Sequence, residues 1–342
     1  MHSKPTMKDV ARLAGVGTMT VSRFLNGTAS VSKETAARVD KAIHELNYRP
    51  NEMARALRGR RSRSIGLILP YLYDTFFSGC GHAVSTVAKQ HGYSVLITTS
   101  NEDPDTEFNE AALMLQRSVE GLIVIPANHG ETRLNRALLG RVPLVAFDRP
   151  ICEPAFDSVV VQNESGALRM VEHLIKHGHK KIFFMGMSAK VYTVHARLQG
   201  YLKAIAEAGL ESYESFQCQT PESTLQEIEK HLRMKTPPTA YFTSNTLATR
   251  FVFTALLQLG VRIPHDAALA GFDDFELADL TSPSLTVVRQ PAQEMGRVAA
   301  SQLFERLKRG ETGQPGCRTV LPVELVLRRS CGCEHEGAVV VQ

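Results

Sequence analysis

The side chains best suited to binding chemistry lie on one face of a short segment near the N-terminus. Residues 18–26 read T-M-T-V-S-R-F-L-N, and at helical spacing their apolar members, Val21, Phe24 and Leu25, share one side. The opposite side then presents Met19 with a polar and basic set, Thr18, Ser22 and Arg23. Hydroxyls and a guanidinium on an exposed helix face can reach phosphates and base edges, so this set favours contact with DNA.

Neighbouring helices are expected to position that face. A repeat of apolar residues predicts a helix over 7–14, and Gly15 suits the left-handed position just after its end. Thr18 begins the second helix, and Ser32 is a suitable N-cap for a third that ends before Pro50. This is the helix-turn-helix pattern, whose second helix fits the major groove of DNA. A helical hairpin inside an ordinary core would show the same spacing.

The distribution of charge favours the DNA-binding interpretation. Residues 1–63 hold 13 lysines and arginines against five acidic residues, a net charge of +8, whereas the remaining residues hold 26 basic and 30 acidic side chains. A basic segment on a mildly acidic body is typical of a protein that meets polyphosphate.

Motifs for catalysis are missing from the sequence. It contains no G-x-x-x-x-G-K-[ST] loop, no G-x-S-x-G elbow and no H-E-x-x-H helix, so we expect no enzymatic activity and no cofactor. The segment Cys331-Gly-Cys333-Glu-His335 offers three ligands where structural zinc takes four, so no metal site is expected. There is no apolar run of 18 residues, and the six cysteines are scattered apart from that segment. We therefore expect a cytoplasmic protein with reduced thiols and no membrane segment.

From residue 64 onward the pattern changes to alternating strands and helices. Short apolar runs predict strands over 65–69, 95–99, 122–126 and 144–147, separated by helices near 76–91, 104–117 and 131–139. A second series has strands over 181–185, 215–219, 240–243 and 267–272, with helices over 195–208, 222–233 and 246–259. A helix near 291–309 and a strand near 318–327 complete the pattern. Two successive series of this kind predict two Rossmann-like α/β lobes with a cleft between them.

Several stretches of the chain carry a resemblance to one protein family. They are K-D-V-A-R-L-A-G-V (8–16), T-V-S-R-F-L-N (20–26), Y-R-P-N-E-M-A-R-A-L (48–57), I-G-L-I-L-P (65–70), G-F-D-D (271–274) and P-S-L-T-V-V-R-Q-P-A-Q-E-M-G (283–296). With these motifs the chain resembles the LacI/GalR family of bacterial transcriptional regulators over about residues 8–329. The resemblance implies an all-α helix-turn-helix domain followed by a periplasmic-binding-protein-like α/β core.

The resemblance also implies how the chain is divided. A DNA-binding domain is expected over 1–48, a hinge helix and linker over 49–63, a core over 64–330 and a tail over 331–342. Within the core, lobe 1 should span about 64–162 and 291–321, and lobe 2 about 163–290 and 322–330. The core would hold a small effector and form a homodimer.

The implied DNA contacts lie on the second helix and on the hinge. They are Thr18, Met19, Thr20, Ser22, Arg23 and Asn26 on the helix, and Asn51, Ala54, Arg55 and Leu57 on the hinge. Gly17 departs from the serine that is usual in the family before the second helix. Leu57 falls where hinge leucines of the family wedge into the minor groove. A hinge helix of about eight residues is marginal alone in water, so we expect it to fold on a near-palindromic, double-stranded operator.

The implied effector contacts lie in the core, at Phe76, Phe77, Asp148, Arg149, Arg197, Asn245 and Asp273. An arginine can fork onto paired oxygens, carboxylates can accept from hydroxyls, and a phenylalanine can stack on a flat face. Asp273 could instead be a capping residue of a turn, and Asn245 a cap at the end of a strand. Asp74 and Thr75 replace the Asn-Pro that often precedes the paired aromatics, which leaves the charge of the effector open.

The expected function is therefore sequence-specific transcriptional regulation, most often repression in this family, controlled by a sugar or related metabolite. A LacI-type regulator with a phosphoprotein corepressor is the first alternative. A soluble solute-binding protein is a second, but it would have no use for the basic N-terminal segment.

Overall fold

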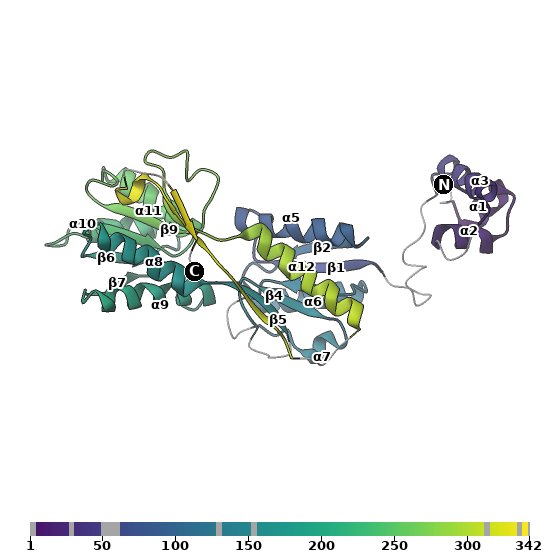
Figure 1. Ribbon diagram of the computed structural model, residues 1–342, viewed down its shortest axis with the longest axis horizontal. Helices are drawn as coiled ribbons and strands as arrows, with labels where there is room; N and C mark the ends of the chain where they lie inside the picture. Colours follow the sequence, from purple (N-terminus) through teal and green to yellow (C-terminus); the bar gives the residue numbers. More distant parts are fainter. Residues whose placement is uncertain are drawn as a thin grey trace. The chain divides into compact units, whose positions relative to one another are not determined.

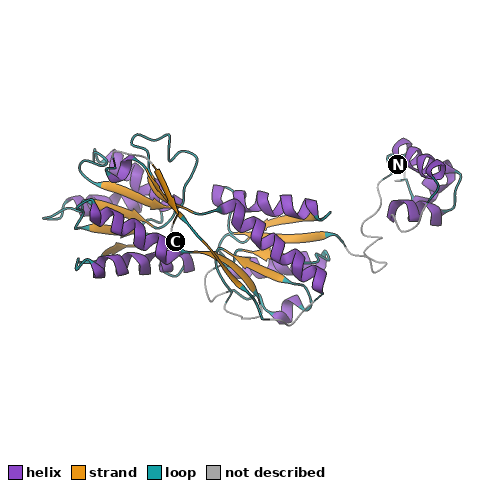
Figure 2. Ribbon diagram, viewed as in Figure 1, coloured by secondary structure: helices purple, strands orange, loops and turns teal. Residues whose placement is uncertain are grey.

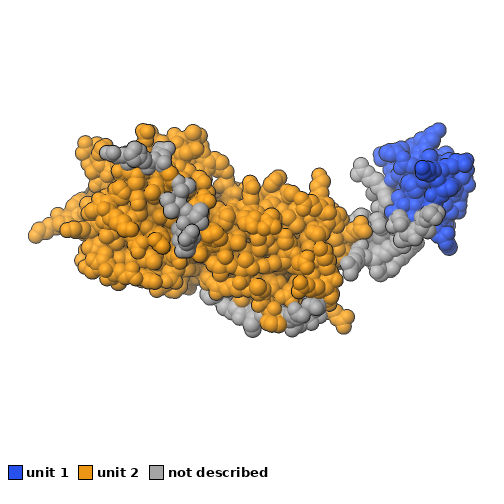
Figure 3. All heavy atoms as spheres, in the orientation of Figure 1, with its two compact units in different colours: residues 1–62 blue, residues 63–342 orange. Residues whose placement is uncertain are grey.

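A computed structural model describes residues 5–26, 31–48, 62–127, 132–151, 156–310, 315–333 and 337–340 of the 342-residue chain. The chain forms two compact units, residues 1–62 and residues 63–342 (Figure 3). None of the helices within those described ranges is both long enough and apolar enough to cross a membrane.

The N-terminal unit contains the predicted trio of helices, α1 (Met7–Ala14), α2 (Thr18–Asn26) and α3 (Lys33–Glu45). Gly15 ends α1 in the left-handed conformation at φ 64°, and the hydroxyl of Ser32 accepts a hydrogen bond from the backbone N–H of Thr35 at 3.3 Å. Val10, Val21 and Val39 are fully buried where the helices meet. The capping signals in the sequence thus placed the helix boundaries correctly.

The first lobe of the larger unit is built on a parallel sheet in the order β11-β5-β4-β3-β1-β2 (Figure 1). Its strands are β1 (Ser64–Leu69), β2 (Ser94–Thr99), β3 (Leu122–Val124), β4 (Leu144–Phe147), β5 (Asp157–Val161) and β11 (Arg318–Leu321). Helices α5 (Thr75–Gln90) and α12 (Ala292–Arg309) pack together over Leu67 and Leu69, whereas α6 (Pro104–Gln116) packs over Ile68. The sheet is therefore covered on both faces, as expected for parallel strands.

The second lobe holds a mixed sheet in the order β13-β12-β10-β9-β8-β6-β7. Its strands are β6 (Ile182–Met185), β7 (Tyr213–Ser215), β8 (Ala240–Thr243), β9 (Ala268–Phe272), β10 (Thr286–Arg289), β12 (Glu324–Leu327) and β13 (Gly337–Val340). Its helices are α8 (Asn163–Lys176), α9 (Tyr192–Glu207), α10 (Pro221–Leu232) and α11 (Thr246–Gln258) (Figure 2). The expected architecture of a helical N-terminal domain and two α/β lobes is confirmed.

Over the part of the larger unit that the structure describes, the chain passes between the lobes three times: from β5 to α8, from β10 to α12, and from β11 to β12. The last crossing corrects the single strand predicted over 318–327. Pro322 lies between β11 and β12 and lacks a backbone N–H, so it cannot continue a hydrogen-bonded ladder. β11 therefore pairs parallel to β5, whereas β12 pairs antiparallel to β10 in the other lobe.

Four smaller differences from the sequence predictions have local causes. The helix expected over 131–139 is only α7 (Arg136–Leu139), because Asn135 caps it by accepting from the N–H of Leu138 at 3.1 Å. The strand expected over 215–219 is β7, which ends at Ser215. Strands β5 and β10 and helix α8 escaped prediction. The residues expected as a tail, 331–342, include the edge strand β13 and the last residue of a short 3-10 helix, η1 (Arg329–Cys331).

Replacing Gly200 with Ala is expected to destabilise the second lobe by about 1–3 kcal/mol. Gly200 lies in α9 where it packs on α8, and a Cβ there would be 2.2 Å from the carbonyl oxygen of Glu164. Gly79→Ala in α5 is the matched control, because its nearest new contact would be an ordinary 3.6 Å. Urea unfolding measures both; equal stability of the two variants would contradict the packing argument.

Candidate functional site

The α2 helix presents the predicted DNA-reading face in the N-terminal unit. Met19 is 68% exposed, Thr18 and Arg23 are also exposed, and Thr20 and Ser22 are partly buried. Val21 anchors the opposite side in the core of the unit. The remaining predicted DNA contacts, Asn51, Ala54, Arg55, Leu57 and the side chain of Asn26, lie outside the described residues, as does most of the hinge.

A cavity of about 520 Å³ lies between the two lobes of the core. Its wall includes every predicted effector residue: Phe76, Phe77, Asp148, Arg149, Arg197, Asn245 and Asp273. The first four come from lobe 1 and the last three from lobe 2, so the fold brings together side chains that are far apart in the sequence. A small molecule held there would touch both lobes.

Arg197 organises the lobe 2 side of this cavity. Its side chain is 2% exposed, and its guanidinium donates to Asn163 Oδ1 at 2.8 Å and to the carbonyl oxygen of Ser244 at 2.6 Å. It also lies 3.3 Å from the carboxylate of Asp273 and stacks over the ring of Phe272. Four contacts fix the plane of the guanidinium before any ligand arrives.

Arg149 has the matching role on the lobe 1 side. It makes a two-point ion pair with Glu102, at 2.5 and 2.6 Å, and lies 3.3 Å from the carboxylate of Asp148. Burial raises the pKa of Asp148 to about 6, although the guanidinium groups of Arg149 and Arg197 act in the opposite direction. The two arginines thus hold carboxylates from opposite sides of one cavity.

Asp148 and Asp273 share an unusual backbone conformation. Both follow the end of a strand and have positive φ angles, 64° and 76°. Non-glycine residues adopt this conformation at a cost of about 1–3 kcal/mol, and such residues cluster at functional sites. The turn aims each carboxylate into the space beyond the strand ends, where ligands of parallel α/β sheets usually bind.

Three predicted contact residues lie at the start of helices, one as an N-cap and two in a first turn. Asn245 caps α11 by accepting from the N–H of Ala248 at 2.8 Å, and its amide NH₂, which also approaches Met187 Sδ at 3.7 Å, is the group that can donate to a ligand. Asn245 therefore does act as a cap, but of the helix that follows β8 and not of the strand end itself. Phe76 and Phe77 lie in the first turn of α5, which Asp74 caps by accepting from the N–H of Phe76 at 2.9 Å.

Sequence reasoning missed several residues of the cavity wall. Tyr71 and Tyr73 stack on each other with ring centroids 5.0 Å apart, Glu102 pairs with Arg149, and Gln290 donates to Asp273 at 2.5 Å. Arg250, exposed on α11, also lines the cavity. The two tyrosines follow β1 directly and could have been found from their position at a strand end. Glu102 and Gln290 carried no local signal.

Replacing Asp148 with Asn is expected to change how stability depends on pH. In the unfolded chain Asp148 ionises near pH 3.8, so between that pH and about pH 6 the folded state binds the extra proton. The contribution of Asp148 to the stability of the folded state is therefore greatest below about pH 4 and is lost as pH rises through 6. Relative to wild type, Asp148→Asn should therefore gain stability from pH 4.5 to 7, by at most about 3 kcal/mol. Asparagine also tolerates the positive φ.

Urea unfolding at three pH values in that range checks this expectation. Asp266→Asn is the control, because Asp266 is exposed and its hydrogen bonds with Arg262 lower its pKa to about 2, below the window. A constant difference between wild type and Asp148→Asn across the window would contradict the burial argument.

The fold and the site define a class of protein: a DNA-binding helix-turn-helix unit joined to a two-lobed ligand-binding core. Residues 6–51 match the model for bacterial regulatory proteins of the lacI family, and residues 171–331 match the periplasmic binding protein-like domain. The chain belongs to the LacI family, as a DNA-binding transcriptional repressor rather than an enzyme.

Individual relatives extend over nearly the whole chain. The HTH-type transcriptional repressor PurR of Aliivibrio salmonicida is 32% identical over 89% of this chain and 92% of its own length. The PurR of Haemophilus influenzae strain PittEE is 31% identical over 95% and 98%. A lac repressor dimer bound to operator and the anti-inducer ONPF aligns with a TM-score of 0.84 and 27% identity over 96% of this chain and 99% of that one. The transcriptional regulator CelR in complex with cellobiose aligns with a TM-score of 0.70 and 28% identity over 95% and 99%.

Proposed function

We propose that this repressor is controlled by an uncharged, polyhydroxylated effector of the size of a mono- or disaccharide, bound in the cavity between the lobes. The observation that carries the proposal is the composition of the cavity wall, which combines aromatic faces with a preset network of carboxylates and guanidinium groups. The likeness to a regulator bound to cellobiose supports it.

The aromatic side chains of the wall suit a flat, partly apolar ligand. Tyr71, Tyr73 and Phe76 lie together at the lobe 1 side, and Phe275 comes from lobe 2. The C–H faces of a sugar ring pack well against such rings, while the hydroxyls at its rim reach outward to hydrogen-bonding groups. A cavity of about 520 Å³ lies within the usual range for small-molecule sites.

The charges of the wall favour a neutral ligand over an anionic one. Among the described lining residues, five carboxylates (Asp74, Glu102, Asp148, Asp273 and Glu276) outnumber three guanidinium groups (Arg149, Arg197 and Arg250). Arg149 and Arg197 are already paired with Glu102 and Asp273. Burial and the nearby charge of Asp273 raise the pKa of Asp74, as expected where carboxylates crowd together. A phosphate or carboxylate would have to enter against this excess of negative charge.

The DNA-binding half of the proposal assigns base contacts to Thr18, Met19 and Arg23. Arginine can bridge the O6 and N7 atoms of guanine, and the other two side chains suit a thymine methyl group or a weak hydrogen bond. Two subunits would place two such helices in successive major grooves of a near-palindromic operator. The effector would change how the lobes close and so alter the spacing of the paired DNA-binding units.

A thermal-shift screen of the full-length protein tests the effector class. Neutral sugars, sugar phosphates, sugar acids and nucleobases are compared at equal concentration. A ligand at 100 times its Kd adds about 2.7 kcal/mol to the stability of the folded state. We expect stabilisation by at least one neutral sugar. Stabilisation by nucleobases alone, or only by the anionic compounds, would overturn the proposed class.

A further inference from the structure

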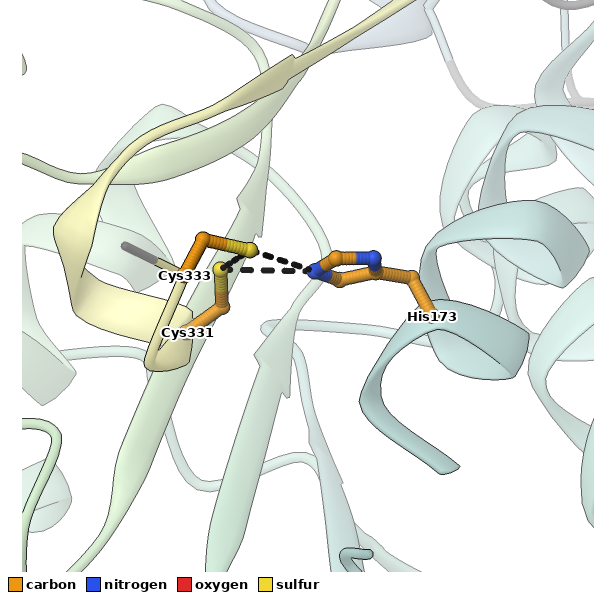
Figure 4. A group of neighbouring side chains, drawn as sticks. All are labelled: His173, Cys331 and Cys333. Carbon is orange, nitrogen blue, oxygen red and sulfur yellow. Dashed lines mark hydrogen bonds between the residues drawn. The ribbon is translucent and has the colours of Figure 1, made fainter. Parts of the chain in front are cut away.

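Two cysteines and two histidines come together in lobe 2, away from the cavity, where α8 meets the C-terminal segment. Cys331 is the last residue of η1 and Cys333 follows two positions later. His173 lies in the last turn of α8 and His177 is its C-cap residue, so the i, i+4 spacing brings the two imidazoles together, tilted by 55° with centroids 4.6 Å apart. Figure 4 shows the imidazole of His173 directed at both sulfur atoms.

The distances among the donor atoms of Cys331, Cys333 and His173 are those of a metal site, and the imidazole of His177 lies beside them. His173 Nε2 lies 3.4 Å from Cys331 Sγ and 3.3 Å from Cys333 Sγ, and the two sulfurs are 3.2 Å apart. His177 Nε2 is 3.5 Å from Cys333 Sγ. Zinc–ligand bonds of 2.0–2.3 Å put the donors of a regular tetrahedron about 3.3–3.8 Å apart. An ion at the centre of the cluster would thus require only small movements of the side chains of His173, Cys331 and Cys333.

We propose that Cys331, Cys333, His173 and His177 form a tetrahedral Zn²⁺ site. Two thiolates and two imidazoles are a donor set that zinc prefers in structural sites, where four protein ligands close the coordination shell. The donor atoms of Cys331, Cys333 and His173 all lie within 4.8 Å of one another. His177 is exposed, so its side chain is free of packing that would prevent it from turning toward the ion.

The surroundings of the cluster support an ion rather than a chance contact. Cys331 is 1% exposed, and Thr286 Oγ1 lies 3.1 Å from its sulfur and 2.9 Å from the carbonyl oxygen of Arg328, so its one proton can turn from that carbonyl to a metal-bound thiolate and orient it. Cys333 is partly buried and His177 is exposed, which gives an ion a route from solvent. The bound ion would tie the C-terminal segment to α8, the first helix after the crossing from β5.

This assignment replaces the sequence-based expectation of no metal site. The three ligands considered from the sequence were Cys331, Cys333 and His335, and His335 lies outside the described residues. His173 precedes Cys331 by 158 residues, and no local pattern connects the two. The fold alone brings them together.

Zinc content of the purified, full-length protein tests the proposal. The reduced protein is stripped with a chelator, loaded with ZnCl₂, separated from free ion and analysed by mass spectrometry for bound metal. We expect one Zn²⁺ per chain, and Co²⁺ in its place should give the intense visible absorption of a tetrahedral thiolate site. Cys333→Ser, a partly buried position that spares the core, should weaken zinc affinity at least about 100-fold, and His173→Asn similarly.

Cys317→Ser is the matched control, because it removes an exposed thiol away from the cluster and should retain one Zn²⁺ per chain. Failure of the wild-type protein to hold stoichiometric zinc would overturn the proposal, as would retention of zinc in both Cys333→Ser and His173→Asn. Unchanged affinity in His177→Asn would overturn the four-ligand assignment. A protein that instead forms a Cys331–Cys333 disulfide in the presence of reductant, with no bound zinc, would also refute the site.

Discussion

Arg197→Ala is expected to abolish the response to the effector and to lower the stability of the core by about 3 kcal/mol. The guanidinium is almost fully buried, and its loss leaves Asp273 without a cation while Asn163 and the carbonyl of Ser244 lose a donor. The substitution also removes the guanidinium that lobe 2 holds in place to bind the effector. Operator binding should persist, because the contacts proposed for DNA lie in the N-terminal unit.

The double variant Arg197→Ala/Asp273→Asn separates the two effects. Neutralising Asp273 removes the unpaired buried charge, so part of the lost stability should return, whereas the effector response should stay lost. Arg262→Ala, which breaks an exposed ion pair with Asp266, is the control and should change stability far less than Arg197→Ala does. Calorimetric titration of the effector and urea unfolding measure the two properties. A normal response in Arg197→Ala at the usual effector concentration would show that the cavity assignment is wrong.

Arg23→Ala is expected to weaken operator binding by about 1–3 kcal/mol and to relax the choice of base at one position in each half-site. Arg23 is exposed on the outward face of α2, whose other side is held by buried Val21. A guanidinium in the major groove discriminates guanine from other bases, so its removal should affect operator more than unrelated DNA. Fluorescence anisotropy with operator and with unrelated DNA, at one fixed salt concentration, gives the ratio of the two affinities.

Arg12→Ala provides the matched control for Arg23. Arg12 is equally a surface arginine of the N-terminal unit, but it lies on α1 and pairs with Asp9 at 2.9 Å. Its loss should reduce affinity for operator and unrelated DNA by the same factor, through the salt-dependent phosphate term. If Arg23→Ala also left the ratio of the two affinities unchanged, its assigned contact with a base would be refuted.

Local signals in the sequence were sufficient for most of the fold. Gly15 and Ser32 mark helix boundaries through capping geometry, which depends on neighbouring residues only. Apolar runs located β1, β4 and β8 because strands buried on both faces admit few polar side chains. The error at 318–327 arose because Pro322 separates two strands that belong to different lobes, and pairing partners are not encoded in a strand itself.

Residues of the candidate site could be predicted from the sequence only where they lie in motifs that resemble those of the family. Asp148, Arg197 and Asp273 were found by resemblance and line one cavity, but Glu102 and Gln290 were not, because their roles depend on Arg149 and Asp273 arriving from distant elements. The same limit applies to His173 and Cys331, which meet only through the fold. No rule of sequence spacing connects such pairs of residues, so they can be identified only from the structure.

The measurement that tests the central claim most directly is operator affinity with and without the ligand found in the screen. The operator is selected from random DNA by the purified full-length protein, and anisotropy titrations are made at one salt concentration. Coupling of about 1–3 kcal/mol between the two sites predicts that saturating ligand changes the operator Kd about 5–150-fold in the wild type. Arg197→Ala should show no change. Identical operator Kd values for wild type with and without saturating ligand would contradict control of DNA binding from the cavity.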